Sequence, residues 1–305
     1  MRRYAGFVSD SARWERFDLR PDDVVISVPS KCGTTWMQTM VGMLIFGSPD
    51  LPAPIGSLSP WMDMLTRSED EVFGILSAQS HRRFIKTHTP LDGLPWSDTV
   101  TYLTVMRHPL DVAMSIRDHL QAIDRGRVRD LLVEVAGNEH FNGADSDDPP
   151  EDLSGYLGWW IDRESEQWED GAGSLAELVM QSQTYWRERH RPNVHLFHYD
   201  DLWNDLPAEM RRLAEGLGVA VPPDRWPELA EAANLDSMRS RAAVLVPESD
   251  LDIWETPTSF FRTGGRRAWA DLLSPQDLEQ YRLRLVTLVG MEHAAWIDRS
   301  IERRG

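Results

Sequence analysis

The sequence predicts an α/β fold, a single three-layer domain over residues 1–305 with a central parallel sheet. Four short segments are near-continuous apolar runs, as in parallel strands buried on both faces. They are VVISV (24–28), RFIKTH (83–88), TYLTVM (101–106) and VHLFHY (194–199). Helical patterns separate these runs, and such alternation favours helices packed on one sheet. With 305 residues, of which 41% are hydrophobic, the chain can bury a large core.

The helices that follow these strands carry start signals. An apolar run with helical period begins at Trp36, after the first strand. Ser68 and an acidic first turn open a helix at 68–79, and Pro109 opens one at 109–123. Ser174, with Glu177 three residues on, predicts a capping box at the start of 174–190. The C-terminal third is expected to be mostly helical, at 206–217, 223–233, 274–289 and 294–303.

Two segments lack periodicity. Residues 137–155 are acidic and rich in Gly, Pro and Asp, which predicts a loop. Residues 247–269 contain many large side chains. A long loop of that kind is more often functional than a simple connection.

Charge and cysteine usage exclude several classes of protein. The net charge of −17 and the pI of about 4.9 argue against a nucleic-acid partner. A single cysteine, Cys32, allows no internal disulfide and favours a reducing, cytoplasmic location. No apolar run reaches roughly 18 residues, so no membrane span is expected. The N-terminal segment also lacks the apolar stretch of a secretory signal.

The loop after the first strand has the composition of an anion site. Backbone N–H groups from Gly33 to Trp36 would lie at a helix N-terminus, with Lys31 adding a positive charge. The glycine and lysine spacing of an ATP-binding loop is missing. The strand 101–106 ends in Arg107, which suits a second phosphate, where a magnesium-dependent enzyme would need an aspartate. The loop therefore predicts a nucleotide with two separated anionic groups and no required metal.

Five motifs, in order along the chain, resemble those of the cytosolic-type sulfotransferases, which use 3′-phosphoadenosine 5′-phosphosulfate (PAPS) and release adenosine 3′,5′-bisphosphate (PAP). They are KCGTTW (31–36), KTHTPL (86–91), RHPLDVAMS (107–115), HYDDL (198–202) and FFRTGGRRAW (260–269). The resemblance covers nearly the whole chain and is strongest to actinobacterial members, some of which act on glycolipids. It implies a P-loop-like loop that binds the phosphosulfate.

The resemblance also implies a set of cofactor-binding residues. The loop would supply Lys31, Cys32, Gly33, Thr34, Thr35 and Trp36. Arg107 and Ser115 would hold the 3′-phosphate, and Tyr199 and Leu235 would lie at the adenine. Phe260, Phe261, Arg262, Thr263 and Gly264 would close over the nucleotide. The sequence departs from the family at Cys32, Leu235 and Thr263, where serine, phenylalanine and lysine are usual. Only Glu279 fits the family's dimer motif, so a homo-oligomer of another kind stays possible.

Three residues are implied to be catalytic. His88 would be the general base that takes the proton of an acceptor hydroxyl as its oxygen attacks sulfur. Lys31 would stabilise charge on the leaving phosphate oxygen, and Lys86 would assist at the sulfuryl oxygens. Lys86 could instead form a structural salt bridge, and Arg107 could pair with Asp111 at the start of its helix. The other histidines, His119 among them, are interpreted as structural or are given no role.

The acceptor is expected to be a hydroxyl-bearing small molecule, lipid or glycolipid. Trp61, Met62, Met64 and Trp254 suggest a broad apolar surface for it, although core packing explains these four residues equally well. Two other functions make different demands on the sequence. A phosphotransferase would need magnesium and a carboxylate at a strand end. A non-catalytic nucleotide-binding protein would have lost His88 or Lys31, and both are present.

Overall fold

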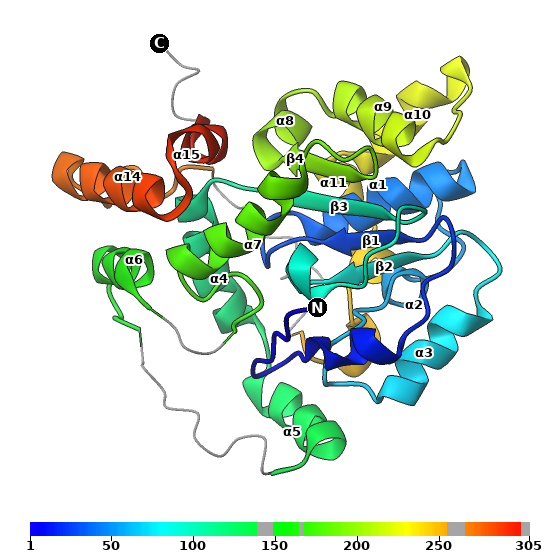
Figure 1. Ribbon diagram of the computed structural model, residues 1–305, viewed down its shortest axis with the longest axis horizontal. Helices are drawn as coiled ribbons and strands as arrows, with labels where there is room; N and C mark the ends of the chain where they lie inside the picture. Colours follow the sequence, from blue (N-terminus) through cyan, green and yellow to red (C-terminus); the bar gives the residue numbers. More distant parts are fainter. Residues whose placement is uncertain (139–148, 165–167, 255–265, 300–305) are drawn as a thin grey trace.

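The computed structural model describes residues 1–138, 149–164, 168–254 and 266–299. All four predicted strands are confirmed: β1 (Val24–Ser27), β2 (Phe84–Thr87), β3 (Thr101–Met106) and β4 (Val194–His198). They form a parallel sheet in the order β2-β1-β3-β4 (Figure 1). Because the strands are parallel, the residues that follow them lie at one edge of the sheet. The four sequence motifs that begin at or just after these strand ends are therefore neighbours in space.

Helices form most of the remaining described chain. Their bounds are α1 (Thr34–Phe46), α2 (Ile55–Leu58), α3 (Glu69–Ala78), α4 (Pro109–Ala122), α5 (Arg125–Ala136), α6 (Leu153–Asp162), α7 (Leu175–Glu188), α8 (Tyr199–Asn204), α9 (Leu206–Leu217), α10 (Trp226–Ala233), α11 (Leu235–Ser240), α12 (Ala242–Leu245), α14 (Pro275–Val289) and α15 (Met291–Ile297). Short 3-10 turns lie at η1 (Ser11–Arg16), η2 (Leu91–Gly93), η4 (Pro223–Arg225) and η5 (Ser249–Leu251). Among the described helices, none is long and apolar enough to cross a bilayer.

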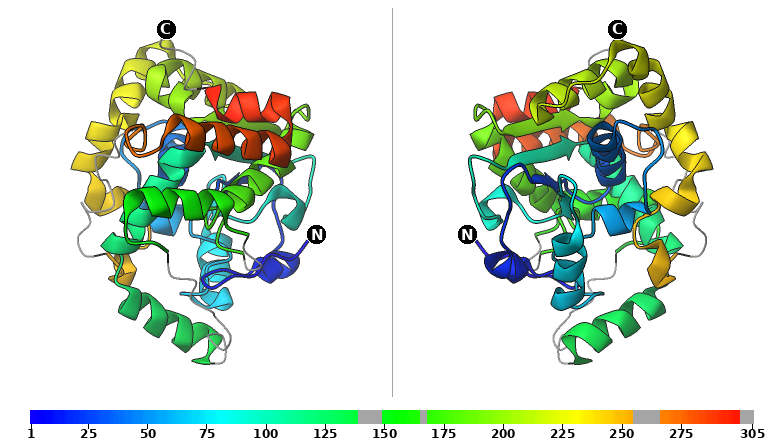
Figure 2. Two further views of the ribbon diagram at one scale, coloured as in Figure 1. Left: turned by 90° about the vertical axis from the view of Figure 1, so that its left-hand side faces the viewer. Right: turned by 90° about the vertical axis from the view of Figure 1, so that its right-hand side faces the viewer.

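Both faces of the sheet are covered, as the continuous apolar runs predicted. Ile26 of β1 belongs to a core cluster with Met37 and Met40 of α1. The neighbouring Val25 points to the opposite face, where it packs in a second cluster with Tyr185 of α7. Figure 2 shows the helical layers from both sides, with α5 at the opposite end of the molecule from α9 and α10.

Several predicted helix signals are confirmed. The Ser68 side chain accepts a hydrogen bond from Glu71 N–H at the start of α3, and Pro109 occupies the first turn of α4. The capping box predicted at α7 is only half formed. Ser174 accepts from Glu177 N–H, but the Glu177 carboxylate accepts from the N–H groups of Glu169, Gly171 and Gly173 instead. The glutamate therefore holds the loop before the helix, which sequence spacing does not reveal.

Other predicted boundaries are wrong. The expected loop 137–155 overlaps α6, which begins at Leu153, and α5 just before it had no prediction. The last described helix begins at Met291 and not at 294, because Gly290 ends α14 and allows a new start, and it ends at Ile297. Residues 300–303 of the predicted helix lie outside the described ranges. The fourth strand ends at His198, and its expected last residue, Tyr199, begins α8. Residues 139–148 of the acidic loop (137–155) lie outside the described ranges, as do residues 255–265 of the second aperiodic segment (247–269), called the second loop below.

Candidate active site at the carboxyl ends of the strands

The loop between β1 and α1 has the geometry of an anion site. Gly33 is the N-cap of α1, with a φ of 110°, and no side chain caps the helix. The N–H groups of the first turn, from Thr34 to Trp36, therefore have no partner within the helix. A Cβ at Gly33 would lie 3.2 Å from Cδ2 of Tyr199. The φ favours glycine at the position, and a Cβ there would press on the Tyr199 ring.

Lys31 lies in this loop in the left-handed region, with a φ of 65°. Its Nζ is 3.4 Å from Nδ1 of His119. Burial, followed by the nearby charges of Arg107 and Lys86, lowers the pKa of Lys31 to about 8. A bound anion would relieve that repulsion, so the position favours anion binding.

Arg107 follows β3 and faces the same loop. Its Nη1 donates to the Lys31 carbonyl over 3.4 Å, and its guanidinium lies 4.6 Å from the ring centroid of Tyr199. Nε of Arg107 is buried and has no hydrogen-bond partner among the described residues. The alternative pairing of Arg107 with Asp111 is not what the structure shows, because Asp111 accepts from Arg267 N–H and from the indole N–H of Trp269. Arg107 thus keeps a donor for an external oxygen acceptor.

The aromatic residues expected at the adenine lie beside the loop. The rings of Trp36 and Tyr199 meet edge to face, with centroids 5.2 Å apart. The indole N–H of Trp36 donates to the carbonyl of Ala233 over 2.8 Å, so this ring is fixed by the protein. Leu235 begins α11 directly after this anchor and is half-buried against the main core. The structure therefore brings all three residues to one side of the loop.

The remaining loop and helix positions have different surroundings. Cys32 is fully buried in the main core, where burial raises the pKa of its thiol to about 12. Its contribution to a ligand would come from the backbone. Ser115 is half-buried on α4, eight residues after Arg107. Phe260, Phe261, Arg262, Thr263 and Gly264 lie outside the described residues.

His88 is a buried, neutral imidazole just after β2. Its Nδ1 lies in hydrogen-bond contact with the carbonyl of Val28. A carbonyl only accepts, so Nδ1 carries the hydrogen and Nε2 keeps its lone pair. Burial, with the charges of Lys86 and Lys31, lowers the pKa of His88 to about 3. The ring is therefore neutral near pH 7 and offers Nε2 as a proton acceptor.

Lys86 forms a buried ion pair. Its Nζ lies 3.0 Å from Oε1 and 3.3 Å from Oε2 of Glu248, and both residues are less than a tenth exposed. The same Nζ lies 4.5 Å from the ring centroid of Trp61. The structure thus contains the salt bridge considered as the alternative for Lys86. Sequence reasoning did not identify Glu248, which lies in the aperiodic second loop.

Trp61 is held against His88 by a buried carboxylate. The two rings meet edge to face with centroids 4.4 Å apart. Asp63, which is fully buried, accepts from the indole N–H of Trp61 over 2.7 Å and from the Thr87 hydroxyl over 2.6 Å. It accepts also from the indole N–H of Trp14 over 3.1 Å. Asp63 therefore connects the wall of the site to β2 and the N-terminal segment.

The four residues expected to form the acceptor surface divide into two kinds. Met62 is fully buried in the second core cluster, which gives it a packing role. Met64 and Trp61 line a small hollow together with Arg67 and Glu248. Trp254 is half-buried, and its indole N–H donates to the carbonyl of Pro247 over 2.8 Å. The structure therefore brings three of the four toward His88 or its neighbours.

His119, interpreted as structural from the sequence, lies in this basic pocket. It is on the last turn of α4, and its ring centroid is 5.3 Å from that of Trp254. Burial and the charges of Lys31, Lys86 and His88 lower the pKa of His119 well below 6.5. The sequence gives no signal for a functional role of His119, because nothing in it indicates which face of α4 meets the second loop.

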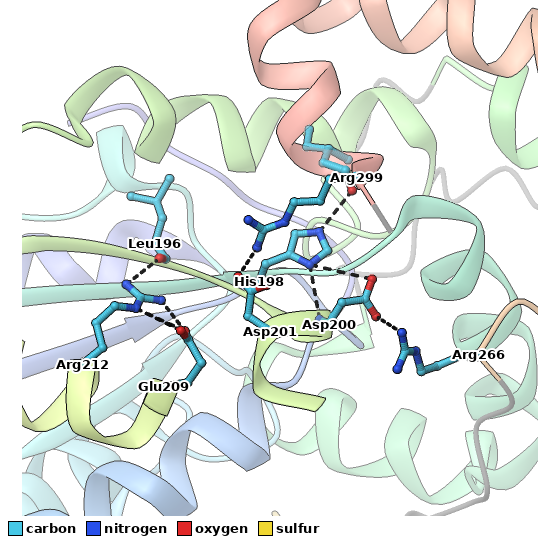
Figure 3. A network of polar contacts seen from close by, with 9 residues as sticks. Leu196, His198, Asp200, Asp201, Glu209, Arg212, Arg266 and Arg299 are labelled. Carbon is cyan, nitrogen blue, oxygen red and sulfur yellow. Dashed lines mark hydrogen bonds and ion pairs between the residues drawn. The ribbon is translucent and has the colours of Figure 1, made fainter. Parts of the chain in front are cut away.

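A second polar network lies behind the adenine side. Figure 3 shows His198 beside Asp200, with Asp200 paired to Arg266 over 3.1 Å. His198 Nδ1 accepts from Asp200 N–H, and its Nε2 lies 3.1 Å from the carbonyl of Ile297. These contacts connect the start of α8, where Tyr199 lies, to Arg266 of the second loop and to Ile297 at the end of α15.

The site has two halves, and the donor half comprises Lys31–Trp36, Arg107 and Tyr199. The acceptor half comprises Trp61, Lys86, His119, Glu248 and Trp254, and His88 lies next to both. Among the residues that the structure describes, no group of three or more His, Cys, Asp or Glu side chains could hold a metal ion.

Comparisons with known proteins agree with this geometry. Residues 21–285 match the family described as the sulfotransferase domain. The chain is 39% identical to a glycolipid sulfotransferase of Mycobacterium bovis, over 99% of this chain and 95% of the relative. A glycolipid sulfotransferase of Mycobacterium tuberculosis is 38% identical with the same coverage. The fold resembles that of mouse sulfotransferase SULT7A1, solved with PAP, with a TM-score of 0.67, 17% identity, and 95% and 93% of the two chains covered.

Proposed function

Because this chain belongs to the sulfotransferase domain family, and is therefore a sulfotransferase, we propose that it transfers a sulfuryl group from PAPS to a hydroxyl of a small-molecule, lipid or glycolipid acceptor. The proposal names the donor from the anion-binding geometry of the donor half and from the PAP in solved structures of the same fold. It names the acceptor class from the relatives that are glycolipid sulfotransferases. The cytoplasm is the proposed location, because PAPS is made there.

The residues of the donor half fit a nucleotide with two separated anions. The first-turn N–H groups of α1 and Lys31 would hold the 5′-phosphosulfate. The buried Nε of Arg107, which has no partner in the described part of the chain, is a matching donor for the 3′-phosphate. Ser115 would add a hydroxyl there. Trp36 and Tyr199 would contact the adenine ring, with their own positions fixed by the contact between them.

The single observation that carries the mechanism is the state of His88. Its Nδ1 is bound to the Val28 carbonyl, so Nε2 is the atom with a free lone pair. In the proposed reaction, the acceptor oxygen attacks sulfur while Nε2 takes the hydroxyl proton, and the sulfur–oxygen bond to PAP breaks. Lys31 would stabilise the charge that develops on the leaving oxygen. Lys86 is paired with Glu248, so any help it gives to the sulfuryl oxygens would have to compete with that carboxylate.

Calorimetric binding of PAP, with and without EDTA, tests the donor assignment. We expect tight binding that EDTA does not change and that falls about a hundredfold in Arg107→Ala, as when a charged hydrogen-bond donor is removed. Arg239→Ala, which removes an arginine that pairs with the exposed Asp236, is the matched control. Binding of ATP with magnesium but not of PAP would contradict the proposal and favour a phosphotransferase.

A further inference from the structure

His119 and His88 are two neutral imidazoles in one basic pocket, but their nitrogens are arranged differently. His88 turns Nδ1 to a carbonyl and keeps the lone pair of Nε2. His119 turns Nδ1 to the ammonium of Lys31, at 3.4 Å. An ammonium only donates, so this Nδ1 is the acceptor and the hydrogen of the neutral ring is on Nε2. The two rings therefore offer complementary groups, a proton acceptor on His88 and a proton donor on His119.

The Nε2–H group of His119 has no hydrogen-bond partner among the described residues. The ring lies between Lys31 and Trp254, 5.3 Å from the Trp254 ring centroid. Burial, followed by the positive charges of Lys31 and Lys86, lowers the pKa of His119 well below 6.5. Its N–H is therefore a hydrogen-bond donor in the same pocket as the base, next to the cationic Lys31.

A hydrogen-bond donor in the same pocket as a general base suits one class of acceptor substrate. A lone hydroxyl needs only the base that takes its proton. A compound with hydroxyls on adjacent carbons presents a second oxygen beside the reacting one, and that oxygen can accept a hydrogen bond. The Trp61 ring lies against His88 and the Trp254 ring against His119, so each histidine has an aromatic surface beside it. Aromatic surfaces with a few convergent polar groups are typical of small-molecule sites.

We propose that His119 determines acceptor specificity by donating its Nε2–H to the hydroxyl adjacent to the one that His88 deprotonates, so that the site selects polyols such as sugars over compounds with one hydroxyl. This inference rests on the proposed sulfotransferase function and deepens it, because it assigns the acceptor class to a named atom. His119 binds the acceptor and takes no part in the transfer of the sulfuryl group.

The test uses two acceptors with the same apolar chain. Octyl β-D-glucoside carries adjacent hydroxyls, and 2-(octyloxy)ethanol carries a single one. For the native protein and for His119→Phe, kcat/KM is measured with each acceptor at saturating PAPS. We expect the ratio of glucoside to ether to fall about tenfold in His119→Phe, as for the loss of one hydrogen bond to a sugar oxygen. His119→Gln, which keeps an N–H donor, should recover part of the ratio.

A second histidine provides the control. His190 is exposed at the end of α7, away from the pocket, and His190→Phe should leave the ratio unchanged. An equal fall with both acceptors in His119→Phe would overturn the proposal, because His119 would then act only through Lys31. An unchanged ratio, or a native protein that sulfates the ether but not the glucoside, would overturn it as well.

Failure of the underlying function has a separate signature. If the native protein neither binds PAP nor transfers sulfate from PAPS to any hydroxyl, the sulfotransferase proposal itself is wrong. If PAP binds and the ether is sulfated, that proposal stands, and only the assignment to His119 is decided by the ratio.

Discussion

The donor half of the site consists of residues that directly follow three neighbouring strands, whereas the acceptor half gathers side chains from segments far apart in the sequence. Lys31–Trp36 follows β1, Arg107 follows β3 and Tyr199 follows β4. The acceptor half takes Trp61 from the connection before β2, His119 from the end of α4, and Glu248 from the second loop. The parallel sheet positions the first set by itself, whereas in the acceptor half it positions only Lys86, which lies on β2.

Different forces hold the two halves in place. The donor half depends on backbone geometry and on apolar packing, with Gly33 at a φ of 110° and Cys32 in the main core. The acceptor half depends on buried polar contacts, the Lys86–Glu248 ion pair and the hydrogen bonds of Asp63. Acceptor recognition can therefore change through single polar side chains while nucleotide binding is kept, and each prediction below tests that separation.

The largest effect, a loss of kcat, is expected at His88, which lies next to both halves. His88→Gln removes the base but keeps a polar side chain, so kcat should fall about a thousandfold, as for the loss of a general base. The affinity for PAP, measured by calorimetry, should stay within about twofold because His88 is not among the expected phosphate ligands. His190→Gln is the control. A loss of PAP affinity in His88→Gln, alongside the loss of kcat, would show that His88 contributes to PAP binding as well as to proton transfer.

The ion pair of the acceptor half is the next test. Glu248→Gln leaves the Lys86 ammonium buried without its counter-ion, which should cost about 3 kcal/mol in the free energy of unfolding. Urea unfolding measures it, and Asp236→Asn, which removes an exposed ion pair with Arg239, should cost almost nothing. PAP affinity should be kept. If Lys86→Met restores stability in the Glu248→Gln background, the buried charge of Lys86 is the cause of the loss. A free energy of unfolding that Glu248→Gln leaves unchanged would refute this account.

A glycine in the donor half should give a smaller effect, and that effect should be on PAP affinity rather than on stability. Gly33→Ala would force a Cβ into the left-handed region and within 3.2 Å of Tyr199, so PAP affinity should fall about tenfold. Gly47→Ala, at the other end of α1, also places a Cβ on a left-handed backbone, with a φ of 60°, but meets no atom within 4 Å. It should lower stability by about 1 kcal/mol without changing PAP affinity. Equal effects on PAP binding would mean that strain alone, not the contact with Tyr199, is responsible.

The same contrast explains how much the sequence could predict. All four strands could be predicted from apolar runs, and the anion-binding loop and Arg107 from local spacing, whereas the role of Tyr199 was implied only by the resemblance to the sulfotransferase family. Glu248, Asp63 and His119 could not be predicted. Each acts through a partner more than twenty residues away in the sequence, and no local pattern indicates such a pair.

Local sequence patterns also gave wrong expectations where a residue that fits one role makes different contacts in the fold. Glu177 has the spacing of a capping box, but three loop N–H groups bind its carboxylate, and burial raises the pKa of Glu177 to about 8. Met62 has the apolar character of an acceptor surface, but it packs in the core behind Trp61. Burial and long-range hydrogen bonds decide both cases, and neither is visible in sequence spacing.

The smallest expected effect is the pH dependence of the reaction. Lys31 is charged below its pKa of about 8 and loses its charge as the pH rises through that value. Since the cation binds the donor, kcat/KM for PAPS should fall by half near pH 8 and continue to fall above it. His88, with a pKa of about 3, stays neutral throughout the range between about pH 5 and 7, so no acidic limb from the base is expected there. Lys31→Arg should move the alkaline limb upward, because a guanidinium keeps its charge. An acidic limb near pH 6.5 that disappears in His88→Gln would show that the base is more exposed to water than its buried position beside Trp61 implies.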